Sequence, residues 1–185
     1  MLVLRSALLL AAMAAVWLAG PAAGAQGPTS PVRPVGDLDL DRYMGRWYEL
    51  ARYPNRFQKS CTGDVEVFYT RRADGRIDVT NTCATARGRI EAQGVARRAQ
   101  NSAWASVLQV RFAPAFLSFL PVWGDYWVLH LAPDYSTAVV GTPGRDYLWI
   151  LSRTPHVDGP TYVNLVDAAR TQGYDVTRIV RTPHK

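Results

Sequence analysis

The segment GRWYELARY, residues 45–53, is the first of eight short segments that are rich in Val, Ile, Tyr, Trp and Phe. Turn residues separate these segments at a spacing of roughly 8 to 12 residues, which is typical of an all-β barrel or sandwich. We therefore expect strands at residues 47–53, 65–71, 77–83, 89–97, 103–112, 126–131, 136–141 and 147–153.

The connections between these segments indicate how the strands are ordered. Ala73-Asp74-Gly75 and Ala132-Pro133-Asp134 are strong turn sequences between apolar segments, as expected between antiparallel neighbours. Eight strands in up-and-down order can close on themselves and leave an interior just large enough for one small ligand. The sequence thus predicts an all-β fold, an eight-stranded antiparallel up-and-down barrel.

One helix is expected after the last strand. Tyr162, Leu165, Val166 and Ala169 recur at helical spacing, in a segment bounded by Pro160 at its start and Gly173 just beyond its end. The apolar stripe of this helix is expected to pack on the barrel wall.

The first residues of the chain are expected to be removed. Arg5 precedes an apolar run over residues 7–19, and Ala23-Gly24-Ala25 offers small residues for cleavage before Gln26, the layout of a secretory signal peptide over residues 1–25. A membrane anchor is the alternative, but the run is shorter than the roughly 20 residues of a bilayer span. Residues 26–36, rich in Pro, Gly and Ser, are expected to form a flexible leader, and residues 37–185 a single folded domain. The protein is then periplasmic or secreted, with association with the outer membrane left open.

Charge and cysteine content narrow the possible partners. The net charge of +6 includes Arg5, so the chain expected after cleavage carries 6 − 1 = +5, with arginines scattered from Arg42 to Arg181. This chain lacks the basic stripe of a nucleic-acid binder, so no nucleic-acid partner is expected. Attraction to an anionic membrane stays open. The two cysteines, Cys61 and Cys83, are expected to form one disulfide in an oxidising compartment. Two thiols alone make a poor zinc site, so no metal is expected.

Three short motifs resemble those of a known family. Gly45-Arg46-Trp47-Tyr48, Asp134-Tyr135 and Arg153-Thr154-Pro155 are similar to the three lipocalin signatures, in the same order. The flanking residues 47–52 and 146–155 resemble the bacterial lipocalin subgroup, which is also similar to apolipoprotein D. The resemblance runs from about Asp37 to the C-terminus and implies a barrel that binds a small hydrophobic molecule.

Alternating strand direction brings the three motifs to one end of the barrel. We expect Trp47, Asp134 and Arg153 to meet there, with the guanidinium of Arg153 over the indole of Trp47, an arrangement that contributes about 0.5 to 2 kcal/mol. This pairing would close the barrel, and we assign it to structure rather than to chemistry. Gly45 and Tyr135 belong to the same structural motif.

The opposite end is expected to be the mouth of the barrel, formed by residues 54–63, 85–88, 113–124 and 142–146. Its loops are unusually apolar, with Phe57, Phe116, Leu117, Phe119, Leu120 and Trp123. Contiguous apolar patches mark interaction sites, so ligand gating or peripheral contact with a membrane is expected. Folding inward as a lid and contact with a protein partner are the alternatives.

Period-2 alternation selects the side chains that point into the barrel, although a bulge in any strand would reverse the assignment. The expected pocket is formed by Val67, Tyr69, Val79, Asn81, Val110, Phe112, Tyr126, Val128 and Trp149. Asn81, Tyr69 and Tyr126 could hydrogen-bond a head group, and the family resemblance implies pocket roles for Asn81 and Trp149. Simple filling of the interior by these side chains is the alternative.

Catalytic motifs are absent from the sequence. It holds no His-Glu-x-x-His, no Gly-x-Ser-x-Gly and no phosphate-binding glycine loop, so no catalytic residue and no cofactor are expected. His130 is an even number of residues from Tyr126, so it could point to the same face of the strand and into the barrel. There, a polar side chain that fills space is favoured over a catalytic base or a haem ligand. Glu49, two residues from Trp47, is consistent with a structural position at the floor of the barrel as well as with a chemical role.

The leading hypothesis is a non-enzymatic carrier that binds, stores or transports a fatty acid, lysophospholipid or similar lipid by sequestration. Three rivals remain: an isomerase or hydrolase on the same scaffold, which would need a titratable pair such as His130 with Glu49; a pigment or haem carrier; and an interaction module that uses the mouth loops. The sequence leaves the identity of the ligand and the oligomeric state open.

Overall fold

The structure is a computed structural model that describes residues 30–112 and 122–185. The strands of this part are β1 (Gly45–Arg52), β2 (Gly63–Arg71), β3 (Ile77–Thr85), β4 (Gly88–Arg98), β5 (Val107–Arg111), β6 (Gly124–Leu131), β7 (Thr137–Gly141), β8 (Leu148–Ser152) and β9 (Val180–Arg181). The helices are α1 (Leu40–Tyr43), α2 (Gly159–Thr171) and the 3-10 turns η1 (Arg56–Gln58) and η3 (Val176–Arg178).

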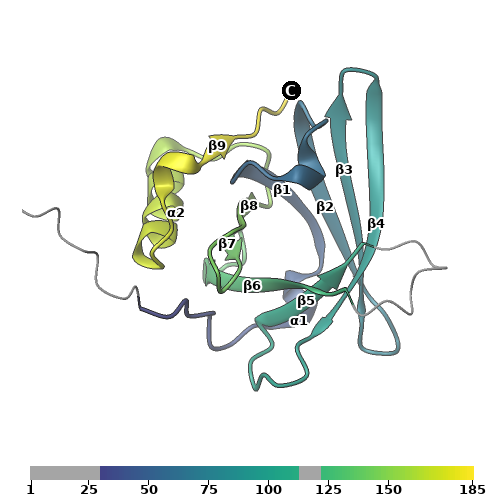
Figure 1. The fold of residues 1–185 in the computed structure, drawn as a ribbon, viewed down its shortest axis with the longest axis vertical. Helices are drawn as coiled ribbons and strands as arrows, with labels where there is room; N and C mark the ends of the chain where they lie inside the picture. Colours follow the sequence, from purple (N-terminus) through teal and green to yellow (C-terminus); the bar gives the residue numbers. More distant parts are fainter. Residues whose placement is uncertain (1–29, 113–121) are drawn as a thin grey trace, which may run out of the picture.

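The first eight strands close into a barrel. They pair in sequence order from β2 to β8, and β1 pairs antiparallel with both β8 and β2, which leaves no gap in the wall (Figure 1). Trp47 lies opposite Val67 on one side of β1, and Glu49 lies opposite Leu151 on the other. The predicted eight-stranded antiparallel barrel is therefore confirmed.

The alternation of burial along β2 and β3 shows how sequence selects the two faces of the wall. Val65, Val67 and Tyr69 are buried, whereas Phe68 between them is 47% exposed. On β3, Val79 is buried in the same way. Successive side chains of a strand point to opposite faces, so the apolar set of each strand lines the interior.

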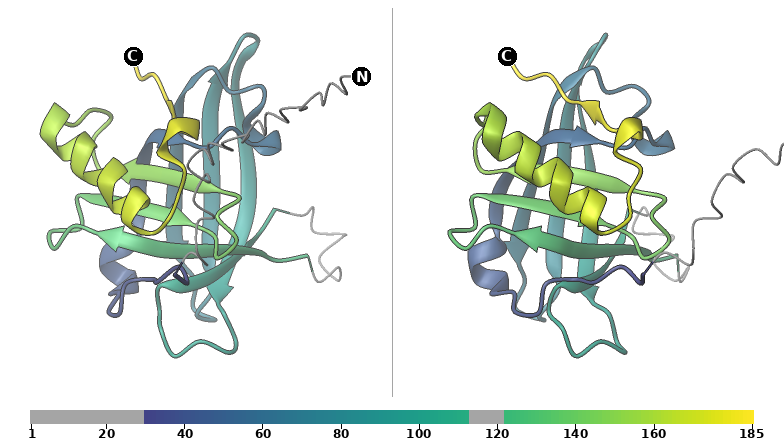
Figure 2. Two further views of the ribbon diagram at one scale, coloured as in Figure 1. Left: turned by 60° about the vertical axis from the view of Figure 1, so that its left-hand side comes forward. Right: turned by 90° about the vertical axis from the view of Figure 1, so that its left-hand side faces the viewer.

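The helix α2 covers the outside of the barrel over β6 and β7 (Figure 2). Its first turn is capped by Asp158, whose carboxylate accepts from the backbone N–H of Thr161, and it ends before Gly173, which adopts a positive φ. Leu165 and Ala169 are buried in a cluster on the outer wall. The predicted helix and its packing are confirmed.

Four short elements were not predicted: α1, β9 and the 3-10 turns η1 and η3. The two residues of β9 pair with Ala51 and Arg52 of β1, and α1 is a single turn capped by the carboxylate of Asp39. A two-residue strand has no alternation to detect, and one helical turn has no periodicity. Strand β5 also starts later than expected, at Val107, because the preceding residues form a turn stabilised by Ser102.

The N-terminal residues of the described chain lie against the barrel. In the segment expected to be a flexible leader, Val32 is buried and the backbone N–H of Val35 donates to the carbonyl of Val128 over 2.9 Å. Ser106 donates its hydroxyl to the carbonyl of Val35. Residues 30–36 are therefore held on the wall, because their two valines add to its apolar contacts. The expected signal peptide, residues 1–25, lies outside the described residues.

The predicted disulfide is confirmed. Cys61, in the loop after η1, is bonded to Cys83 on β3, with 5.6 Å between their Cα atoms and a sequence separation of 22. The bond ties the loop that follows β1 to the barrel wall.

Replacement of both cysteines by alanine is expected to lower the free energy of unfolding by about 3 kcal/mol, because the loop is no longer closed in the unfolded chain. Urea denaturation of the oxidised wild type and of the Cys61→Ala/Cys83→Ala variant measures the difference. A reductant should destabilise the wild type and leave the variant unaffected. Equal midpoints for the two oxidised proteins would contradict this expectation.

Candidate functional site

The barrel encloses a cavity of about 750 Å³ that opens at the end carrying the loops after β1, β3, β5 and β7. Alternation along the strands brings most of the expected pocket residues to its surface. Those that line it are Val67, Tyr69, Val79, Asn81, Val110, Phe112, Tyr126 and Trp149. The structure thus brings together side chains that are distant in sequence around one mainly apolar space.

Val128 is the expected pocket residue that does not line the cavity. It is fully buried in the interior cluster, which also contains Trp47 and Val140. Its side chain is on the inward face, as the alternation predicts, but it is covered by its neighbours. Packing against the closed end therefore removes it from the cavity surface.

His130 does not line the cavity either. The pairing of β6 with β7 shifts register between Val128 and His130, and Leu131, one residue further on, packs against the interior cluster. Since neighbours on a strand face opposite sides, the bulge turns His130 outward. The sequence-based expectation that His130 shares the inward face of the strand with Tyr126 is therefore wrong.

Partial burial lowers the pKa of His130 below its usual value of 6.5. The unfolded chain then binds a proton more readily than the folded chain, so the stability associated with neutral His130 is present above about pH 6.5 and is lost as the pH falls through that value toward the folded pKa. We expect the melting temperature of the wild type to fall more steeply between about pH 7.5 and about pH 5 than that of His130→Gln. Thermal unfolding across this range measures both slopes, with His156→Gln, at an exposed histidine, as the matched control. Parallel curves for the wild type and His130→Gln would refute the assignment.

The floor of the cavity is formed by three tyrosines that come from different elements. Tyr126 of β6 shares hydrogen bonds with the hydroxyls of Tyr43 of α1, at 2.9 Å, and Tyr69 of β2, at 2.7 Å. Burial raises the pKa of all three phenols above their usual value. Tyr43 was missed by the sequence reasoning, and the one available signal was Asp39, which caps the single turn that carries it.

Below this floor, Trp47 and Arg153 close the barrel. The guanidinium carbon of Arg153 lies 3.9 Å from the centre of the Trp47 ring. Its two terminal nitrogens donate to the carbonyls of Arg46 and Arg42, each over 2.7 Å. Gly45 adopts a φ of +89°, a conformation that favours glycine, and a Cβ at this position would lie 3.5 Å from Arg153. The structure places Trp47 and Arg153 as expected.

In the second motif, Asp134-Tyr135, it is Tyr135 that contacts the closed end of the barrel, and not the side chain of Asp134. The carbonyl of Tyr135 accepts from Nε of Arg153 over 3.3 Å, and the Tyr135 hydroxyl accepts from the backbone N–H of Asp39. The carboxylate of Asp134 instead accepts from the backbone and hydroxyl of Ser136. Asp134 therefore shapes the turn, and Tyr135 joins the closed end.

The described part of the cavity rim carries several exposed apolar side chains among polar ones. Phe57 is 64% exposed and Val122 69% exposed, and Ile90 and Phe112 also present exposed surface beside the opening. The ring centre of Trp123 lies 4.0 Å from the guanidinium of Arg97 and 4.7 Å from that of Arg111. The remaining expected mouth residues, Phe116, Leu117, Phe119 and Leu120, lie outside the described residues.

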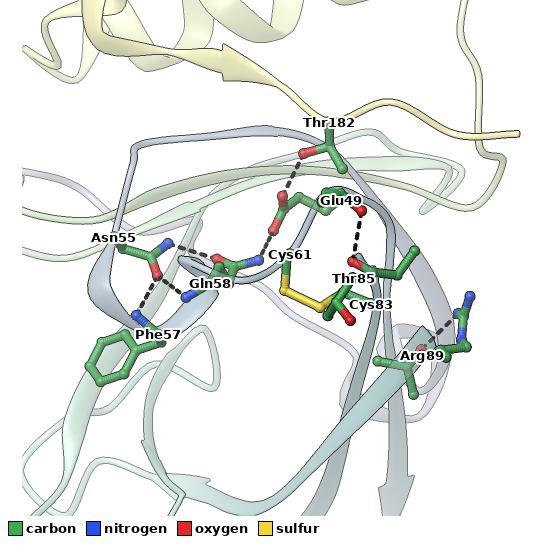
Figure 3. The surroundings of a disulfide bond; sticks show 12 residues. Glu49, Asn55, Phe57, Gln58, Cys61, Cys83, Thr85, Arg89 and Thr182 are labelled. Carbon is green, nitrogen blue, oxygen red and sulfur yellow. Dashed lines mark hydrogen bonds between the residues drawn. A yellow bond between two sulfur atoms is a disulfide. The ribbon is translucent and has the colours of Figure 1, made fainter. Parts of the chain in front are cut away.

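Glu49 lies on the mouth side of the cavity, not at the floor, in a chain of polar contacts (Figure 3). Its carboxylate accepts from Gln58 over 2.6 Å and from Thr182 over 2.5 Å. It also accepts from Arg52 over 2.8 Å. The side-chain oxygen of Gln58 accepts in turn from Trp149 over 3.1 Å. Both carboxylate oxygens of Glu49 are therefore engaged in joining the first loop and the C-terminal segment to the barrel.

Residues 30–112 and 122–185 offer neither a metal site nor a membrane-spanning helix. No group of three or more His, Cys, Asp and Glu side chains in these ranges is arranged to hold a metal ion. Within the same ranges, no helix has the length and apolar character needed to cross a membrane.

Comparisons with known proteins agree with the fold. Residues 38–184 match the family model described as a lipocalin-like domain. The chain is 44% identical over 150 residues to temperature-induced lipocalin-1 of Arabidopsis thaliana, covering 80% of this chain and 81% of the plant protein. It is 34% identical over 155 residues to the outer membrane lipoprotein Blc of Escherichia coli strain K12, covering 83% and 84% of the two chains.

The solved structure of insecticyanin from the tobacco hornworm Manduca sexta superimposes with a TM-score of 0.67 at 18% identity, covering 83% of this chain and 85% of that chain. At this identity the likeness shows the fold alone. The sequence relatives and the family model carry the stronger statement, because the match spans the whole barrel and the helix that follows it. This chain therefore belongs to the lipocalin family.

Proposed function

We propose that the protein binds, stores or transports an elongated lipid, such as a fatty acid or lysophospholipid, inside the barrel. The observation that carries the proposal is the open cavity of about 750 Å³ with a mainly apolar lining. This size lies within the roughly 300 to 1,000 Å³ of ligand pockets. Each methylene group removed from water contributes about 0.8 kcal/mol, so an acyl chain would supply the driving force for binding. Lipocalins are among the barrels whose interior holds one small ligand.

The mechanism is sequestration through a single opening. Trp47 and Arg153 block the far end, so the ligand would enter and leave past Phe57 and Phe112 at the rim. The exposed apolar rim also suits peripheral contact with a membrane surface, from which a lipid could be taken up.

The arrangement of titratable groups favours binding over catalysis. Glu49 and His130 were the candidate acid-base pair, but Glu49 is engaged by three donors and His130 faces away from the cavity. A general base must be within hydrogen-bond reach of the proton that it removes. Lipocalins are in general binding proteins without enzymatic activity, and we propose the same for this chain.

We also propose that the protein works in the cell envelope or outside it. The disulfide between Cys61 and Cys83 is typical of extracytoplasmic proteins, and the bacterial relative of the same family is named an outer membrane lipoprotein. Residues 1–25 would be removed as a signal peptide, so the mass of the exported protein should correspond to a chain beginning at Gln26. An uncleaved N-terminus would contradict this part of the proposal.

Native mass spectrometry and lipid extraction of the exported protein test the binding function. We expect a co-purifying lipid, and a fluorescent fatty acid should bind the delipidated protein with one site per chain. Hexadecanoic acid and a lysophospholipid should displace it. A protein that carries no lipid and binds neither probe would overturn the proposal, and an absorption band in the visible range would point to a pigment or haem instead.

A further inference from the structure

The hydroxyls of Tyr43, Tyr69 and Tyr126 form a short hydrogen-bonded chain at the deep end of the cavity. Tyr126 is in the middle, with 2.9 Å to Tyr43 and 2.7 Å to Tyr69, and all three residues line the cavity. We call these three residues the tyrosine floor. Polar groups in such a buried position are costly unless they are paired, so the pairing within the floor can be counted proton by proton.

The tyrosine floor has one more hydroxyl proton than it has internal hydrogen bonds. Burial raises the pKa of each phenol, so all three hydroxyls keep their protons near neutral pH. A hydroxyl donates one hydrogen bond and accepts up to two. Three protons serve two hydrogen bonds within the floor, and in the described part of the chain these hydroxyls pair only with one another. Whichever tyrosines act as donors within the floor, one O–H has no acceptor there, so its acceptor must come from the cavity.

The surroundings of the floor select the kind of acceptor. The nearby lining is apolar, with Val67, Val79 and Leu108. Arg153 is near enough for its charge to act on Tyr43 and Tyr69, but it does not line the cavity. Each of its three guanidinium nitrogens already donates to a backbone carbonyl, of Arg42, Arg46 or Tyr135. An ionised carboxylate at the floor would have no cation in direct contact with it, because Arg153 does not reach the cavity surface. Burying a charge without such a contact is far more costly than burying a neutral polar group. A neutral oxygen is the acceptor that fits.

We infer that the tyrosine floor is a binding subsite for a neutral hydroxyl or carbonyl oxygen at the inner end of an elongated apolar ligand. The inference rests on the proposed function and deepens it, because it names a class of ligand: a chain that carries oxygen at the end remote from its charged head group. The charged group stays at the mouth, where the cavity opens to solvent.

Competition binding with two matched acids tests this inference. One is hexadecanoic acid with a hydroxyl on its terminal carbon, and the other is heptadecanoic acid, in which a methyl group of similar size replaces that hydroxyl. Each displaces a fluorescent fatty acid from the delipidated protein. We expect the wild type to bind the hydroxy acid about 3- to 10-fold more tightly, the gain from one net hydrogen bond.

The variant Tyr43→Phe/Tyr69→Phe/Tyr126→Phe removes the hydroxyls and keeps the shape of the floor. Replacing all members of a hydrogen-bonded group by apolar ones of the same shape can be nearly neutral for stability. The preference should reverse in this variant, because the ligand hydroxyl would then be buried without a partner. Tyr162→Phe, on the helix outside the barrel, is the matched control and should keep the wild-type ratio of affinities.

Equal affinities of the wild type for the two acids would overturn the inference, whether or not the triple variant folds. A preference that survives in the folded triple variant would overturn it as well, since the hydroxyl would then be bound elsewhere. In both cases the acids still bind, and the proposed lipid-binding function stands. Failure of both acids to bind the wild type would instead overturn the proposed function itself.

Discussion

Replacement of Trp47 by alanine is expected to lower the free energy of unfolding by about 3 to 5 kcal/mol, the range for removing a large aromatic side chain from a core. Trp47 is completely buried, its ring centre lies 4.9 Å from that of Tyr43, and its indole N–H donates to the carbonyl of Tyr43 over 2.9 Å. The substitution also leaves Arg153 without the ring on which it lies. Urea denaturation followed by circular dichroism measures the loss.

The matched control for this prediction is Trp104→Ala. Trp104 is 45% exposed and lies in the loop before β5, so its removal should change stability by less than about 0.5 kcal/mol. If Trp47→Ala cost no more than Trp104→Ala, the closed end would not stabilise the barrel in the way described.

Substitution of Val110 by glutamate is expected to weaken the binding of hexadecanoic acid by at least about 100-fold. Val110 lines the cavity and is partly buried, so the carboxylate can be hydrated while the barrel is empty. A bound acyl chain would displace this water and bury an unpaired charge, at a cost of several kcal/mol, and each 1.4 kcal/mol corresponds to about tenfold in affinity. Displacement of a fluorescent fatty acid measures the change.

Val163→Glu provides the control, because it makes the same substitution at an exposed valine of α2. Both variants should retain the far-ultraviolet spectrum of the wild type, and only Val110→Glu should lose affinity. Undiminished binding by a folded Val110→Glu protein would show that the ligand does not occupy the cavity.

The strands of the barrel were predicted well because their signal is local. The apolar residues of β2 and β3 recur at every second position, and the turn at Asp74 and Gly75 connects β2 directly to β3. The same local signals did not predict β9, which is defined only by its pairing with β1. They also placed the start of β5 too early, in a turn rich in polar residues.

The candidate site was predicted less completely, for the same reason. Period-2 alternation placed Val67, Val79 and Val110 at the cavity, but the bulge in β6 reversed the orientation of His130. A bulge depends on how two strands pair and leaves no mark in the alternation itself. Tyr43 was missed because it enters the barrel from α1, outside every expected strand.

The sequence by itself determined the barrel, the helix after it, the disulfide and the meeting of Trp47 with Arg153. The barrel and the Trp47–Arg153 contact follow from alternation, turn residues and strand direction, and the helix follows from its helical spacing. The disulfide follows from the presence of just two cysteines in a chain expected in an oxidising compartment. Only the tertiary structure decided that Tyr43, Tyr69 and Tyr126 share a hydrogen-bonded floor. It likewise joined Glu49 to Thr182, which is 133 residues away. Contacts of this kind depend on strand register and on which side chains remain unpaired once the barrel has closed. Local sequence patterns therefore do not predict them.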